Sequence, residues 1–231
     1  MDYKKSSLWR NTLGRNDESV ASLRDAYESV RENGAYILGK IRKDFPNLTV
    51  HDITHVDSLW QVASIIIGDS YPINPLEGFV LGCTFVIHDS VLSYEAFGGV
   101  DKLRNTDTWK DYYEDYKCVT TLTPEQQLTE TDFNTIRLLH AQYARYINDK
   151  LFYREDGSSF YLIEDESIRS HFGDLICRVA ASHHSNVEEI ENLGIQYPSP
   201  SGFSVELTLA VFSKNPFVKA LAVTQTVTLS P

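Results

Sequence analysis

The 231-residue chain has no run of 18 or more apolar residues, the length that a membrane-spanning helix needs. Its first 20 residues also lack the apolar stretch of a secretory signal. The three cysteines, Cys83, Cys118 and Cys177, are too few and too widely spaced for a disulfide framework or a zinc-binding cysteine cluster. Cys83 and Cys177 lie in apolar stretches, which is typical of buried thiols in a reducing compartment. We therefore expect a cytoplasmic protein with no membrane partner.

Basic residues are also scarce. The 21 lysines and arginines stand against 32 aspartates and glutamates, and the formal net charge is −11 at pH 7. An acidic surface repels phosphate backbones, so a protein that coats DNA is disfavoured. A nuclease is not excluded, because a bound divalent metal reverses the local electric field.

Most of the chain has the apolar spacing of helices. Residues 17–45 carry apolar side chains at helical spacing, and Gly34 is expected to divide this stretch into two helices. The apolar stretch from Leu76 to Val91 is too long for a typical strand and predicts a central buried helix. Residues 93–122 are aromatic and acidic, which favours a surface insertion with short helices.

Thr123-Pro124-Glu125-Gln126 is a capping box that predicts a helix start, and a helix through residues 133–152 is expected to follow. The last residues differ, because no acidic residue follows Glu206 and threonine and valine become frequent. The fold class is therefore predicted as all-α, a helical bundle over residues 1–206. Residues 207–231 form an atypical tail that we expect to be irregular, with a strand as the alternative, and that could be non-native or disordered.

The dipeptide His88-Asp89 is the strongest local signal. It follows the apolar run "FVLGCTFVI", so an imidazole and a carboxylate are both expected at the end of a buried helix. Burying the two groups is costly unless they are paired or bind a metal. The same dipeptide occurs at His51-Asp52, but an aspartate there is explained as the N-cap of the following helix.

Three further histidine sites fall on separate predicted helices. His55 begins the apolar stripe of Val56 and Leu59, and His140 is in phase with a buried stripe. The pair His183-His184 ends the apolar face of another helix, whereas His171 has only a structural explanation. A lone histidine is more often a core residue than a ligand, but four such sites on four helices favour a shared metal centre. An all-helical scaffold with incidental histidines is a third interpretation.

This order of histidines resembles the HD-domain superfamily of metal-dependent phosphohydrolases. "THVDSLWQVA" is similar to its first-histidine helix and "FVIHDSVLS" to its signature helix. "RLLHAQYA" is similar to the third-histidine helix and "VAASHHS" to the double-histidine segment of binuclear members. The chain is most similar to a bacterial HD subfamily of conflict and defence systems, whose HD module often precedes a chaperone-type (GHKL) ATPase domain. Such an ATPase domain, or another protein, is accordingly an expected partner.

The resemblance implies an HD-like helical bundle that holds a divalent metal (Mn, Fe, Zn, Ni or Mg) and hydrolyses a phosphate-containing small molecule or a nucleic acid. The metal ligands that it implies are His55, His88, Asp89, His140, His183 and His184, with Asp89 and His88 at the catalytic centre.

One departure from the HD pattern bears on activity. HD domains end the site with a late aspartate, and Asp174 is the last aspartate in this chain. Glu206 lies nearest to the expected place, and a C-terminally truncated member is one explanation. The alternative function is therefore a catalytically weak or inactive HD module that senses a ligand or binds a protein.

Overall fold

The computed structural model describes residues 2–46, 48, 51–68 and 73–186, and residues 196–198, 204–212 and 220–228 by their backbone. In these residues the α-helices are α1 (Ser7–Asn11), α2 (Glu18–Asp44), α3 (Ile53–Ile67), α4 (Pro75–Ile87), α5 (Val100–Arg104), α6 (Asp107–Tyr116), α7 (Pro124–Ala144) and α8 (Glu166–Ala181). Short 3-10 helices are η1 (Tyr3–Lys5), η2 (Tyr94–Phe97), η3 (Ile147–Asp149) and η4 (Ser182–His184). The all-α prediction is confirmed. None of the described helices has the length and apolar composition of a membrane span.

Helix α4 lies at the centre of the bundle, as the apolar stretch predicts. It packs against α1, α2, α3 and α8, and Phe79, Val80 and Val86 are completely buried. Asn74 caps its first turn in a capping box with Glu77, and Pro75 takes the first helical position. The helix ends at Ile87, so His88 and Asp89 follow directly from the best-buried element of the fold.

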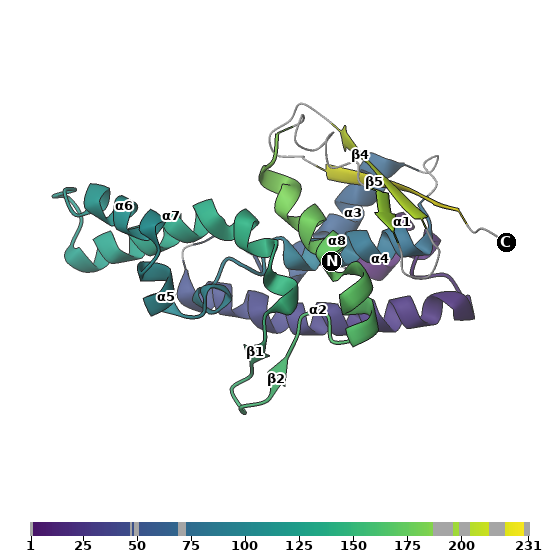
Figure 1. Ribbon diagram of the computed structural model, residues 1–231, viewed down its shortest axis with the longest axis horizontal. Helices are drawn as coiled ribbons and strands as arrows, with labels where there is room; N and C mark the ends of the chain where they lie inside the picture. The colour runs from purple at the N-terminus through teal and green to yellow at the C-terminus, as the bar shows by residue number, and fades with distance from the viewer. Residues whose placement is uncertain are drawn as a thin grey trace.

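Helix α2 is one continuous helix, so the predicted break at Gly34 is wrong. A Cβ atom at Gly34 would lie 2.0 Å from Cγ1 of Val86 in α4. Glycine is therefore needed here because the two helices approach closely. Figure 1 shows α2 as one long, uninterrupted helix.

The surface insertion at residues 93–122 contains η2, α5 and α6, as expected, and it packs against α7. The completely buried Asp132 of α7 fixes it in place. Both oxygens of this carboxylate accept hydrogen bonds from Arg104, at 3.0 and 2.7 Å, and Trp109 Nε1 and Tyr94 Oη donate to it at 2.7 and 2.9 Å. One buried charge is thus compensated by three separate parts of the insertion.

The capping box at Thr123 and Gln126 is confirmed, but it begins the same helix that carries His140 rather than a separate one. After α7, strands β1 (Phe152–Tyr153) and β2 (Ser159–Phe160) form a short antiparallel hairpin that projects from the bundle (Figure 1).

In the C-terminal part, β3 (Gln196–Pro198), β4 (Ser204–Phe212) and β5 (Ala220–Thr228) form an antiparallel sheet. β5 lies against α3 and α4. Residues 207–212 and 220–228 of the tail are thus strands, the alternative that their threonine and valine content favours. Whether this tail is native to the fold stays a prediction.

We predict that Gly34→Ala destabilises the protein by about 1–3 kcal/mol, because the added methyl group has no room beside the stiff, buried Val86. The control is Gly39→Ala in the same helix, where a Cβ atom meets nothing within 4 Å and the change should stabilise by about 0.5–1 kcal/mol. Urea unfolding measures the free energy of unfolding of both variants. Adding Val86→Ala to Gly34→Ala should restore part of the lost stability. Equal stability of the two alanine variants would contradict the close approach of α2 and α4.

Candidate metal centre

Six histidines and one aspartate come together where four helices begin or end. His51 immediately precedes the N-cap of α3, and His55 lies in the first turn of that helix. The others are near helix C-termini: His88 and Asp89 after α4, His140 in the last turns of α7, and His183 and His184 after α8. Three helices therefore direct the negative ends of their dipoles toward the cluster and α3 directs its positive end there, so the balance of the four favours a cation.

Asp89 is the carboxylate of the first group. Only 5% of the residue is exposed, and its Oδ2 atom lies 3.0 Å from His51 Nδ1, 3.1 Å from His88 Nε2 and 3.5 Å from His55 Nε2. Ligand atoms of His51, His55 and Asp89 all lie within 4.8 Å of one another, so these three residues could hold one metal ion.

The charge of Asp89 is compensated by its neighbours. Burial opposes the ionised form, but the charge of His88 and the hydrogen bonds from His51 and His88 outweigh this effect and hold the pKa of Asp89 well below its usual range. Burial alone would lower the pKa of His88, yet the charge of Asp89 raises it above the ordinary histidine value. Burial lowers the pKa of His55. The carboxylate is therefore ionised at neutral pH.

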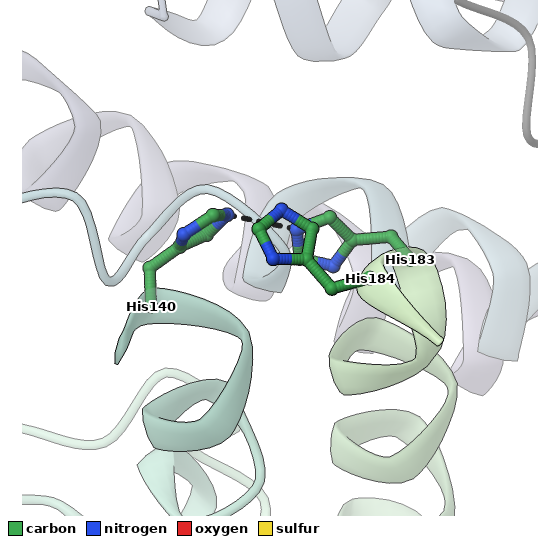
Figure 2. A group of neighbouring side chains, drawn as sticks. All are labelled: His140, His183 and His184. Carbon is green, nitrogen blue, oxygen red and sulfur yellow. Dashed lines mark hydrogen bonds between the residues drawn. The ribbon is translucent and has the colours of Figure 1, made fainter. Parts of the chain in front are cut away.

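His140, His183 and His184 form the second group, with ligand atoms within 4.8 Å of one another. Figure 2 shows the ring of His140, on α7, pointing across the gap between two helix ends toward the rings of His183 and His184. His140 is 7% exposed, and its Nε2 atom lies 2.8 Å from His183 Nε2. Burial lowers the pKa of His140 to about 4 and that of His183 to about 3, so both rings are neutral at pH 7.

The backbone fixes the tautomers of three of these histidines. Nδ1 of His88, His140 and His183 lies within hydrogen-bond distance of the carbonyl oxygen three residues earlier, on Phe85, Arg137 and Ala180 respectively. A carbonyl oxygen only accepts, so Nδ1 must carry the hydrogen in each ring. In the neutral rings the lone pair is then on Nε2, which faces into the cluster. Metal-ligating histidines commonly have this backbone support.

The short contact between His140 and His183 is consistent with a bound cation. With both Nδ1 atoms protonated, two Nε2 lone pairs face each other at 2.8 Å, and neither neutral ring has a hydrogen to donate between them. Two nitrogen ligands bound to one ion at 2.0–2.1 Å would lie roughly 3 Å apart. The donor set therefore fits a divalent metal.

The two groups adjoin. The ring centroids of His88 and His183 are 5.6 Å apart, so the seven residues form one continuous cluster. Its donors are imidazole nitrogens with a single carboxylate among the described members, a composition that suits zinc, iron, manganese or nickel better than magnesium.

All six predicted ligand residues lie in this cluster, and their role as ligands stays a proposal. His171 is exposed on α8, away from it, as expected. Asp52 caps α3 by accepting a hydrogen bond from Thr54 N at 2.8 Å, which confirms the structural explanation of that residue. The predicted burial of Cys83 and Cys177 is confirmed, and Cys118 is exposed.

His51 is the residue that sequence reasoning missed. The sequence explains Asp52 as an N-cap, and this explanation gives no reason to assign a role to the adjacent His51. The signal was the spacing of His51 and His55, one helical turn apart across a helix start, which brings both rings to the same carboxylate. The expected replacement for the missing late aspartate, Glu206, lies on β4, and its side chain is outside the described part of the chain.

A family model for the HD-CE domain matches residues 45–210, which include every member of the cluster. The chain belongs to the HD-CE family. Neither the curated proteins nor the solved structures gave a significant match. The match supports an HD-type domain, with the fold of metal-dependent phosphohydrolases and histidine and aspartate groups that could hold a metal.

We predict that the metal-free protein loses stability as the pH falls from 7 to 5, and that His140 causes part of the loss. Its pKa of about 4 in the folded state is below the unfolded value of about 6.5, so the unfolded chain binds more protons in this range. The loss due to His140 alone is on the order of 2 kcal/mol.

Urea unfolding at several pH values, on protein stripped of metal, measures this effect. His140→Gln should flatten the dependence, and His171→Gln, which removes an exposed histidine outside the cluster, is the control. An unchanged slope in His140→Gln would show that His140 is not buried in its neutral form.

Proposed function

We propose that this chain is a metal-dependent phosphohydrolase. The observation that carries the proposal is one continuous cluster of six histidines around a buried, ionised carboxylate, in which backbone carbonyls fix the Nε2 lone pairs of His140 and His183 toward each other. A structural cluster needs neither the facing lone pairs of His140 and His183 nor so many imidazoles in one place.

Two subsites are proposed. Asp89, His51, His55 and His88 would hold one divalent ion, and His140, His183 and His184 a second. A bound ion supplies Lewis acidity to a phosphoryl oxygen and lowers the pKa of water toward neutrality. The chain's own contribution is to keep Asp89 ionised, to keep His140 and His183 neutral at pH 7, and to hold the rings in one orientation.

A cavity of about 210 Å³ adjoins the cluster and supports a small substrate. His51 and Asp52 line it at one side, and its walls are apolar, with Leu38 and Phe45 among them. Arg42 also lines it and offers a guanidinium group for a phosphate oxygen. We therefore favour a phosphate-containing small molecule over a nucleic acid, in keeping with the net charge of −11.

The alternative is an inactive HD module that senses a ligand or binds a protein. It is favoured by one observation: Asp89 is the sole carboxylate in either metal-type group of the described residues. A site with few carboxylates neutralises less of the metal charge. A defence setting and a chaperone-type ATPase partner remain proposals that rest on the resemblance alone.

We predict that the purified protein hydrolyses bis(p-nitrophenyl) phosphate or p-nitrophenyl phosphate when manganese is added. Asp89→Asn and His140→Gln should each lower the rate at least about 100-fold, because each removes a group that would bind metal directly. Metal content measured by elemental analysis should fall in the same variants.

His171→Gln is the matched control, since it removes an exposed histidine from the helix that leads to His183. Activity that survives in both cluster variants would refute the proposal. Stoichiometric metal without any turnover would favour the inactive module instead.

A further inference from the structure

A second cavity, of about 800 Å³, lies between the C-terminal half of α2, the turn that follows η2, and the base of the β1–β2 hairpin. None of its lining residues belongs to the histidine cluster. Its volume is within the range of about 300–1,000 Å³ that small-molecule sites occupy.

Four lysines line this cavity, against three carboxylates, in a chain of net charge −11. Lys40 is paired with Glu95, and the carboxylate of Asp44 accepts a hydrogen bond from the backbone of Tyr94. Within the described residues, Lys43, Lys102 and Lys150 have no carboxylate at ion-pair distance. Three ammonium groups that form no ion pair among the described residues thus line one cavity, with Asp44 and Glu95 as their acidic neighbours.

Lys150 is half-buried, which is unusual for a lysine that forms no ion pair, and its ammonium group lies over the ring of Phe152. Burial lowers the pKa of its ammonium group; Glu95 opposes this effect and the nearby Lys102 adds to it. The ammonium groups of the lysines that line this cavity repel one another, and a bound polyanion would offset this repulsion.

One glycine keeps the cavity open. Gly39 lies inside α2, and a Cβ atom there would meet nothing within 4 Å, whereas Gly99 is explained by its positive φ of 104°. Glycine inside a helix costs roughly 1 kcal/mol relative to alanine, and close packing does not explain it at Gly39 as it does at Gly34. A side chain at Gly39 would instead extend into the cavity.

We propose that this cavity binds a small molecule that carries two or more phosphate groups, held by Lys43, Lys102 and Lys150. The exposed ring of Tyr153 also lines it and offers a surface on which a base could stack, whereas the ring of Tyr36 is already covered by Lys40 and Arg154. The proposal is independent of the metal centre and of the proposed hydrolysis.

The test is isothermal titration calorimetry of the metal-free protein with inorganic triphosphate, with ATP and with adenosine. Triphosphate should bind with a dissociation constant below about 1 mM, and adenosine alone should bind much more weakly. ATP binding at least tenfold tighter than triphosphate would assign a nucleoside polyphosphate, and equal binding would assign recognition of the phosphates only.

Two variants localise the binding. Gly39→Leu should fold at least as stably as the wild type, because leucine is the better helix former, yet lose binding at least tenfold by filling the cavity. The triple variant Lys43→Gln, Lys102→Gln, Lys150→Gln should also bind triphosphate at least tenfold more weakly than the wild type.

The charge-matched control replaces Lys4, Lys110 and Lys117, which are paired with carboxylates elsewhere on the surface, by glutamine. It should bind like the wild type. The proposal is overturned if no phosphate probe binds, if Gly39→Leu binds normally, or if both triple variants lose affinity equally.

Discussion

The ionised carboxylate of Asp89 is the constraint on which the site depends. A carboxylate that is 5% exposed must be compensated, and breaking a buried charge pair by removing one partner costs about 3–5 kcal/mol. His51, His55 and His88 provide that compensation from the start of α3 and the end of α4. The apolar residues of α4 therefore do more than fill the core, because they carry this carboxylate to the point where four helix ends meet.

Backbone carbonyls then determine which atoms face the centre. The same contact, from Nδ1 to the carbonyl three residues earlier, recurs at His88, His140 and His183, near the ends of three different helices. It leaves the Nε2 atoms of His140 and His183 as electron-pair donors directed at each other, an arrangement that is unfavourable without a cation and favourable with one, whereas Nε2 of His88 faces the Asp89 carboxylate. Membership of the HD-CE family thus agrees with the chemistry of the donors, which could hold a divalent metal.

The all-α class and six residues of the cluster could be predicted from the sequence, because burial and helical spacing are local properties. His88-Asp89 was identifiable as a charged pair after an apolar run, and His140 by its phase on a buried stripe. Gly34 and His51 were misjudged for the same physical reason, since each depends on a neighbour distant in the sequence. Gly34 is explained by Val86 in another helix, and His51 by Asp89, 38 residues later. The second cavity also joins segments too distant for local patterns to connect.

The central claim is that the histidine cluster is a metal site, and anomalous X-ray diffraction from crystals grown with manganese or nickel tests it most directly. The account predicts an anomalous peak within bonding distance of Nε2 of both His140 and His183, and a second peak beside Asp89. A crystal that contains the metal only elsewhere, with His140 and His183 still in direct contact, would contradict it.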